Sequence, residues 1–347
     1  MKNNPLNRHQ SLFLIFAISG LSACDYPSKP DLVGFNFLQD ENTAMNSTGA
    51  CLSMQHLRLT GANSVVLIPF LKQESPQSVE LSKSDAVTDE QLIAALELAK
   101  TNHLHRVLKP QILIENSWAG EITQQNPEQE TNWFVNYTEQ LLHYAHLAEK
   151  HQVDAFVIGT ELKKIQTSEH WPELIKQVRS IYSGKLTYAA GEVAGIEAFP
   201  YWDLLDTIGV TLYPDMTQEK ITDTLTEQLE TLANNFQQPV WILEIGIPSA
   251  KGWESRPWDW RSIETSAPSA DPDTQATIIR HWLTSLEKSQ ASNIEGIWIW
   301  QWSSSPQAGG RNDTSYTVQN KLAQAVVHQH WRSPLSLFMR KVSECTS

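Results

Sequence analysis

Residues 239–249 of this sequence read PVWILEIGIPS. The apolar run after Pro239 is typical of a strand that is buried on both faces, as in a parallel sheet covered by helices. Glu244 stands near the end of this run, where a carboxylate is unfavourable to bury unless it has a partner or a chemical use. The stretch therefore predicts a parallel α/β fold and a special role for Glu244.

Segments of the same kind recur along the chain. The predicted strands are 33–37, 64–70, 106–114, 154–161, 185–190, 206–213, 240–246 and 296–302. Apolar residues at helical spacing occupy 132–150, 171–182, 221–235 and 274–290. Strands that alternate with helices pair in parallel through right-handed crossovers, and eight of them predict a single (β/α)8 TIM barrel.

The connections between these segments are unequal in length. The helix-to-strand links are short, at 151–153, 183–184 and 237–239, whereas the strand-to-helix links are long, at 71–88, 115–131, 247–273 and 303–317. In such barrels the strand-to-helix loops gather at the C-terminal face, where active sites lie. The long loops carry Trp118, Trp253, Trp258 and Trp260. Since flat indole rings suit sugar faces but also fill cores, the composition alone does not decide their use.

A second carboxylate stands in an equivalent place. The strand predicted at 154–161 ends with Glu161, about 80 residues before Glu244, which is close to three barrel units of about 31 residues each. Both side chains should therefore face the mouth of the barrel, from strands four and seven. A single strand-end glutamate is more often an ion-pair partner or a helix cap, but two that face one cleft are the minimal machinery of glycoside hydrolysis.

The local sequences around these residues resemble glycoside hydrolase family 113 of clan A, whose characterised activity is mainly β-1,4-mannanase. The similar segments are Gly34–Asn36, Leu108–Pro110, Trp118–Gly120, Ile158–Leu162, Leu186–Ala190, Trp202–Tyr213, Leu243–Gly246 and Trp298–Trp302. The resemblance implies retention of anomeric configuration, with Glu161 as acid/base and Glu244 as nucleophile. It also places Tyr213 where it hydrogen-bonds the nucleophile.

The resemblance suggests further substrate-binding residues. Trp298, Trp300 and Trp302 alternate, so they should share one face of strand eight. The deepest should fill the barrel, and Trp300 or Trp302 should form the floor beside the cleaved bond, with Trp300 favoured. Lys109 would either donate to a sugar hydroxyl or pair with a carboxylate. Asn36 and Trp118 complete the expected substrate contacts.

Two positions depart from the related pattern. Thr160 precedes Glu161 where many clan A members have an asparagine that contacts the sugar 2-hydroxyl. Glu192 follows strand five where a neutral polar or aromatic residue is usual, and it would either face the cleft or point to solvent. The sugar therefore stays open between mannan, another β-glycan and an amino-sugar polymer, and the loops do not decide between endo and exo action.

The N-terminus has the pattern of a secretory signal. Lys2 and Arg8 precede an apolar run at 12–23 that is too short to span a bilayer as a helix. Its end, Leu21-Ser22-Ala23-Cys24, resembles a bacterial lipobox, with Cys24 as the lipidated residue, although an ordinary signal peptide is the alternative. We therefore expect a signal peptide at 1–23, a tether at 24–32 and a hydrolase domain at 33–347. The protein would be lipid-anchored in the cell envelope, at the inner or outer membrane.

Net charge and the remaining sequence patterns narrow the classes of ligand and cofactor that the protein could bind. A net charge of −13 argues against nucleic acid, and no sequence pattern calls for a metal or another cofactor. Cys51 and Cys345 would either pair or remain free thiols. The expected protein is a monomer that binds a β-glycan. The alternatives are a glycan-binding lipoprotein with little or no catalysis, and a solute-binding receptor.

Overall fold

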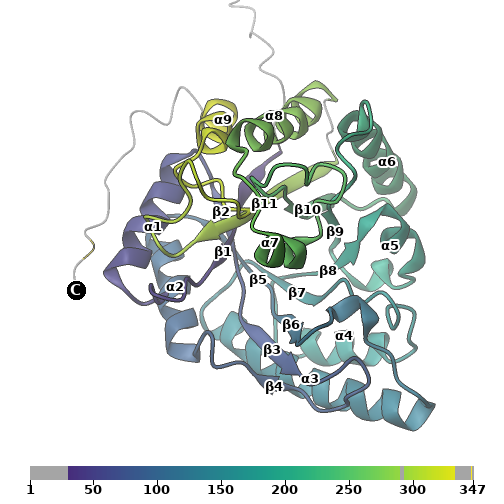
Figure 1. The fold of residues 1–347 in the computed structure, drawn as a ribbon. Coiled ribbons are helices and arrows are strands. Elements are labelled where there is room, and N and C mark those ends of the chain that lie inside the picture. Colours follow the sequence, from purple (N-terminus) through teal and green to yellow (C-terminus); the bar gives the residue numbers. More distant parts are fainter. Residues whose placement is uncertain (1–29, 290–292, 333–344, 346–347) are drawn as a thin grey trace, which may run out of the picture.

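The computed structural model describes residues 30–289, 293–332 and Cys345. Eight parallel strands close into a barrel in the order β1-β2-β5-β7-β8-β9-β10-β11 (Figure 1). They are β1 (Leu32–Leu38), β2 (Ser64–Leu67), β5 (His105–Leu108), β7 (Ala155–Thr160), β8 (Lys185–Gly191), β9 (Thr207–Leu212), β10 (Val240–Ile245) and β11 (Ile294–Ser303). The predicted (β/α)8 barrel is confirmed.

Helices surround the barrel (Figure 1). They are α1 (Thr48–Leu59), α2 (Asp89–Thr101), α3 (Pro127–Lys150), α4 (Trp171–Arg179), α5 (Glu192–Ala198), α6 (Ile221–Phe236), α8 (Pro272–Lys288) and α9 (Leu322–Trp331), with the short α7 (Trp260–Ser266) and two 3-10 turns, η1 (Ala119–Glu121) and η2 (Trp202–Leu204). The helix expected from residue 132 begins at Pro127 instead. The Asn126 side chain accepts a hydrogen bond from the Gln129 amide at 2.9 Å, which caps the helix one residue before the proline.

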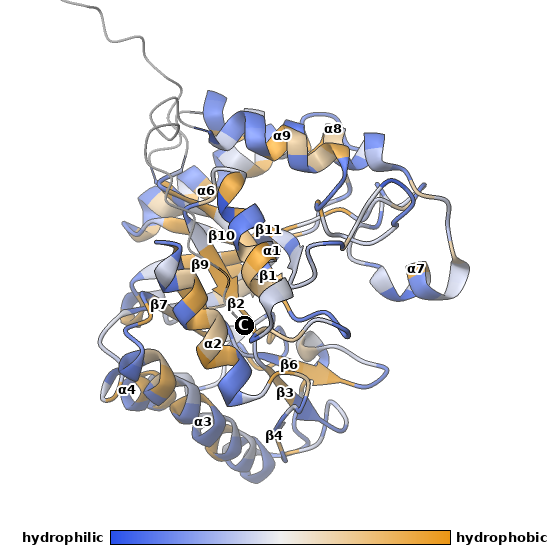
Figure 2. Ribbon diagram, turned by 90° about the vertical axis from the view of Figure 1, so that its left-hand side faces the viewer, coloured by the Kyte–Doolittle hydropathy of each residue, from blue (hydrophilic) through white to orange (hydrophobic). Residues whose placement is uncertain are grey.

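Two of the predicted strands are each divided in two. The expected strand at 64–70 ends as β2 at Leu67, and the one at 106–114 ends as β5 at Leu108. Pro69 and Pro110 follow, and because proline lacks the N–H that a ladder needs, both strands leave the barrel there. Their continuations, β3 (Phe70–Gln73) and β6 (Gln111–Ile114), pair with each other and with β4 (Ser82–Lys83) in a separate small sheet. Figure 2 shows this sheet projecting beyond one end of the barrel.

The apolar core has two layers. The inner layer fills the barrel and includes Val66, Val157, Leu243, Trp241 and Trp298, all fully buried. The Trp241 and Trp298 ring centroids lie 5.3 Å apart, and the Trp298 indole N–H donates to Ser64 Oγ at 2.9 Å. The outer layer packs the helices against the strands. The expectation that the deepest tryptophan of strand eight fills the barrel is thus confirmed.

The two ends of the chain lie partly outside the described residues. A disulfide joins Cys51 in α1 to Cys345, with their Cα atoms 5.9 Å apart, so the open question of pairing is answered. The expected signal peptide at 1–23 and the expected lipidation site Cys24 lie outside the described residues. Among the residues that the structure describes, no helix is long and apolar enough to cross a membrane.

Candidate active site

The two glutamates singled out in the sequence lie at the C-terminal ends of their strands. Glu161 directly follows β7, and Glu244 is the penultimate residue of β10. In the sheet, the Cα of Glu244 is paired with that of Thr211 on β9. The Thr211 hydroxyl in turn donates to Oε1 of Glu161. The side chain of Glu161 thus reaches the strand next to the one that carries Glu244, and the two carboxylates share one site at the mouth of the barrel.

Glu244 is held by three hydrogen-bond donors. Its Oε1 accepts from Lys109 Nζ and, at 2.8 Å, from Gln111 Nε2. Its Oε2 accepts from the Tyr213 hydroxyl at 2.6 Å. The residue is only 4% exposed, so these donors take the place of the water that an ionised carboxylate would otherwise bind. The three contacts fix the positions of both carboxyl oxygens of Glu244.

Lys109 is fully buried and forms the positive side of the site. Burial lowers the pKa of its ammonium group, and the charge and hydrogen bond of Glu244 oppose that effect only in part. The ammonium also lies 5.4 Å from the centroid of the Trp300 ring, within range of a cation–π contact. Of the two roles that the sequence left open for Lys109, the structure shows pairing with a carboxylate.

Glu161 has a different environment. Burial and the nearby charge of Glu244 raise its pKa to about 7, although the Thr211 hydrogen bond and Lys109 act in the opposite direction. Its backbone is left-handed, with φ of 54°, which is unfavourable for a residue with a side chain and is often found at functional sites. The Tyr188 hydroxyl accepts from the next amide, that of Leu162, at 2.9 Å and supports this turn.

Tyr213 is a stable hydrogen-bond donor. Burial, reinforced by the charge of Glu244, raises the pKa of its hydroxyl well above the ordinary value, so the hydroxyl keeps its proton. Its ring packs closely over Gly246, where an added Cβ would lie 2.9 Å from a Tyr213 ring carbon and 3.0 Å from the Trp300 carbonyl oxygen. The glycine in the Leu243–Gly246 segment therefore allows Tyr213 and Trp300 to approach the strand that carries Glu244.

The three alternating tryptophans do not share one face, which corrects the expectation for Trp302. Between two paired positions on β1, Phe35 and Phe37, β11 advances by three residues instead of two, from Ile299 to Trp302. One extra residue reverses the alternation of side chains. Trp302 is therefore 1% exposed on the outer side of the barrel, where its ring lies 4.8 Å from Phe35. Only Trp300, which is partly buried beside Lys109, lies at the site.

Asn36 also differs from its expected role as a sugar ligand. Its side chain is fully buried, and its Nδ2 donates to the carbonyl oxygen of Leu243 at 2.9 Å. It therefore fixes β10 directly before Glu244 rather than facing solvent. Thr160 is 8% exposed, and its hydroxyl has no hydrogen-bond partner within the described part of the chain. Contact between Thr160 and a sugar stays a prediction.

Two further sequence candidates lie on the rim. Trp118 is 42% exposed and precedes the turn η1, in the loop that follows β6. Glu192 is exposed at the first position of α5, and its charge adds to those that raise the pKa of Glu161. Glu192 is thus close enough to the site to influence it. Direct substrate contact by either residue stays a prediction.

Two residues of the site were missed in the sequence. Gln111 donates to Glu244, and Thr211 donates to Glu161. Each is two residues from a residue that was singled out, Lys109 and Tyr213 respectively. Since side chains in a strand alternate between its faces, a search at a spacing of two from each candidate would have found both.

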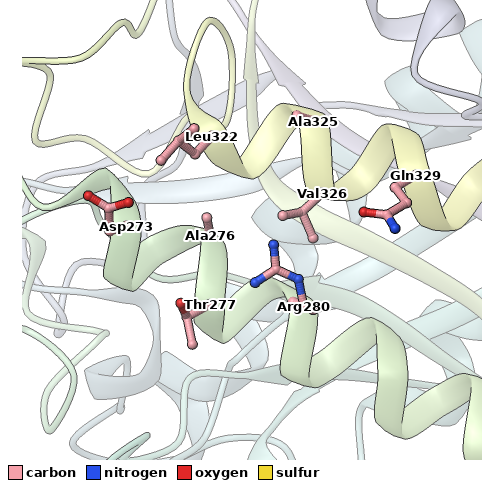
Figure 3. A pocket seen from close by; sticks show the side chains of 8 residues that line it. All are labelled: Asp273, Ala276, Thr277, Arg280, Leu322, Ala325, Val326 and Gln329. Atoms are coloured by element: carbon pink, nitrogen blue, oxygen red, sulfur yellow. The ribbon is translucent and has the colours of Figure 1, made fainter.

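Two pockets of the described chain lie away from the mouth of the barrel. Within residues 30–289, 293–332 and Cys345, no cluster of His, Cys, Asp or Glu is arranged to hold a metal ion. A pocket on the outer wall lies between α8 and α9 and is lined by residues such as Asp273, Arg280 and Gln329 (Figure 3). A second pocket, around Gln237 and Glu295, lies at the N-terminal ends of the strands. The mouth of the barrel remains the candidate active site.

Comparison with known proteins points to one family. The model of glycoside hydrolase family 113 matches residues 33–321. A complex structure of a family 113 β-1,4-mannanase has a TM-score of 0.77 and 25% identity, and the match covers 87% of this chain and 98% of that one. The family 113 β-mannanase AaManA from Alicyclobacillus acidocaldarius, in complex with ManMIm, has a TM-score of 0.77 and 26% identity over 86% and 96% of the two chains.

A further structure of a family 113 β-1,4-mannanase has a TM-score of 0.78 and 25% identity, over 87% of this chain and 99% of that one. No curated protein sequence matches the chain. The fold, the family model and these structures agree on a glycosidase built on a TIM barrel.

Proposed function

The chain belongs to glycoside hydrolase family 113, and on that premise we propose that it cleaves β-1,4-linked mannan with retention of configuration. Glu244 is the proposed nucleophile and Glu161 the proposed acid/base. The three family structures above, at 25% and 26% identity, are β-mannanases, which supports mannan over the other β-glycans.

The difference between the two carboxyl environments is the observation that carries this proposal. Glu244 accepts from Lys109, Gln111 and Tyr213, which hold both of its oxygens in place. Glu161 has a pKa raised to about 7, so a large fraction of it holds a proton near neutral pH. Retaining glycosidases need one carboxylate that attacks and one carboxylic acid that protonates, and their pKa values must differ for that reason.

In the first step, a carboxylate oxygen of Glu244 forms a bond to the anomeric carbon while the glycosidic C–O bond breaks. The electron pair of that bond passes to the leaving oxygen, which takes the proton of Glu161. Tyr213 and Lys109 keep their hydrogen bonds to Glu244 and orient it for attack. The products are a glycosyl ester on Glu244 and a free sugar hydroxyl.

In the second step, the Glu161 carboxylate accepts a proton from water as the water oxygen bonds to the anomeric carbon. The ester bond to Glu244 breaks and restores its carboxylate, and Glu161 is protonated again. Two inversions give net retention. Trp300, beside Lys109, would lie under the sugar at the cleaved bond.

We also propose that the protein is anchored in the bacterial envelope by a lipid on Cys24. The support is the sequence pattern alone, with basic residues, an apolar run and the Leu-Ser-Ala-Cys end. Anchoring would keep the barrel near the membrane while its mouth faces a soluble glycan.

Azide rescue of two variants tests the assigned roles. Glu244→Gly with azide and an aryl β-mannoside should form the α-mannosyl azide, because azide then replaces the nucleophile in a single inversion. Glu161→Ala with azide should form the β-mannosyl azide, because azide attacks the ester on Glu244. Product anomers read by NMR distinguish the two. If the anomers were reversed, the two roles would be exchanged, and unchanged hydrolysis of mannan in Glu244→Gly would exclude it as the nucleophile.

A further inference from the structure

Two long loops meet above the site, from strands that face each other across the barrel. Ser117 lies in the loop that follows β5 and β6, and Arg261 lies in α7, in the loop that follows β10. Three strands separate β5 from β10 on either side of the closed barrel, so they are opposite each other. The Arg261 guanidinium donates to the carbonyl oxygen of Ser117. This contact, which we term the 117–261 bridge, spans the whole mouth.

A second link joins the same two strands at the level of the carboxylates. Lys109 follows β5, and its ammonium group pairs with Glu244 on β10. Between Lys109 and Ser117 the chain runs through the four residues of β6, which lie in the small sheet outside the barrel and extend about 13 Å at the usual 3.3 Å per residue. The ion pair is thus the floor of a closed ring of protein, and the 117–261 bridge is its roof.

The roof is attached to the walls on both sides. The bridge is carried by the loop 246–271. In this loop, the Glu254 carbonyl oxygen accepts a hydrogen bond at 2.7 Å from the Met216 amide, which lies in the loop after β9. On the side of β11, the Tyr316 hydroxyl donates to the carbonyl oxygen of Pro257. Trp253 donates through its indole N–H to the Asp259 carbonyl at 2.9 Å, which holds the loop in shape. Figures 1 and 2 agree in placing α7 over the end of the ring of strands.

The same loop packs directly on residues of the site. Ala250, Trp253 and Ile263 from the loop form an apolar cluster with Tyr316, and Tyr213 and Trp300 pack against it. Tyr213 is the donor to Glu244, so the roof lies on the wall of the site itself. Beside the bridge, the Arg261 guanidinium lies 5.1 Å from the centroid of the Trp260 ring, which orients it further.

A polymer can enter a closed ring only by one of its ends. We propose that the glycan threads beneath the 117–261 bridge, so that the protein attacks chains from an end and does not bind in the middle of a long chain. Arg261 is then the residue that determines this mode of action. The inference deepens the proposed hydrolysis of a β-glycan and rests on it.

Wild type and two variants test this on soluble linear mannan, or on whichever β-glycan the wild type cleaves fastest. Loss of viscosity is plotted against reducing ends formed. Wild type should lose little viscosity per bond cleaved, and Arg261→Ala should lose at least threefold more. The matched control is Lys251→Ala, which removes an exposed cation of the same loop that takes no part in the bridge. It should behave as wild type does.

A second measurement needs no variant. An oligosaccharide that wild type cleaves is compared with the same oligosaccharide carrying bulky groups at both ends. Blocking both ends should reduce turnover at least tenfold, and blocking one end at a time shows which end enters. Viscosity that falls as steeply as with an endo-acting standard, or equal turnover of the blocked substrate, would overturn the proposal.

The proposal would also be overturned if Arg261→Ala folds, turns over short oligosaccharides and keeps the wild-type ratio of viscosity lost to bonds cleaved. Failure of the proposed function appears separately, as oligosaccharide turnover that persists in Glu244→Gly.

Discussion

The replacement Thr211→Val tests whether Glu161 is the general acid. The Thr211 hydroxyl donates to Oε1 of Glu161 and thereby lowers the pKa of that carboxyl against the effects of burial and of Glu244. Valine has nearly the same shape but no hydroxyl. The variant should therefore leave the fold intact and raise the pKa of Glu161 above its value of about 7.

The size of the effect follows from the strength of this hydrogen bond. A hydrogen bond to a charged group contributes about 1.5–3 kcal/mol, and one pKa unit corresponds to about 1.4 kcal/mol, so the shift should be about one to two units. A general acid acts while it is protonated, and the pH profile of kcat/KM reports the pKa of the free enzyme. The alkaline limb should therefore move upward, from near pH 7 to about pH 8 or higher.

The assay is kcat/KM for a mannooligosaccharide from pH 5 to 9, because a natural leaving group needs protonation. Thr207→Val is the matched control, since it makes the same change on the same strand. Thr207 is fully buried, and its hydroxyl has no hydrogen-bond partner in the described part of the chain. If the alkaline limb stays in place for Thr211→Val, or moves equally for both variants, Glu161 is not the group that sets it.

Three further results are expected. Glu161→Gln should stabilise the protein by up to about 3 kcal/mol at pH 8 and should have no such effect at pH 4. The folded-state pKa of Glu161, about 7, exceeds the ordinary 4.5, so the stability of the wild type falls as the pH rises between these values. Equal urea midpoints of both proteins at pH 8 would contradict this. Cys51→Ser should lower the stability of the oxidised protein by about 2–4 kcal/mol, because the Cys51–Cys345 disulfide closes a long loop, and an unchanged thermal midpoint would argue against it. Cys24→Ser should move the protein from the membrane fraction to the soluble fraction, and continued sedimentation with membranes would exclude the lipid anchor.

Much of the fold could be predicted because its signals are local. Alternation of apolar strands with amphipathic helices depends on neighbouring residues, and the tips of parallel strands meet at one end of a barrel whatever the loops do. Glu161 and Glu244 were found in this way. Pro69 and Pro110 could be read from the sequence as well, but the way in which they divide the two predicted strands could not. Each ends a barrel strand, and the two freed continuations then pair with each other to form one wall above the mouth.

The parts that could not be predicted depend on contacts between distant segments. The extra residue of β11 before Trp302 is defined only by its register against β1, so simple alternation placed Trp302 on the wrong face. The bridge between Ser117 and Arg261 joins residues 144 positions apart, and the sequence of neither loop indicates a contact with the other.

The two glutamates differ in their hydrogen-bond partners, although both lie near Lys109. Both lie at the tips of strands in one site, and each charge disfavours ionisation of the other. A single buried ammonium group stands near them, and it forms its hydrogen bond with Glu244. Gln111 and Tyr213 add two more donors on the same side, whereas Glu161 receives the Thr211 hydroxyl. The charge of Lys109 lowers the pKa of Glu161, but burial and the charge of Glu244 outweigh it, so Glu161 keeps the raised pKa that its proposed role as acid needs.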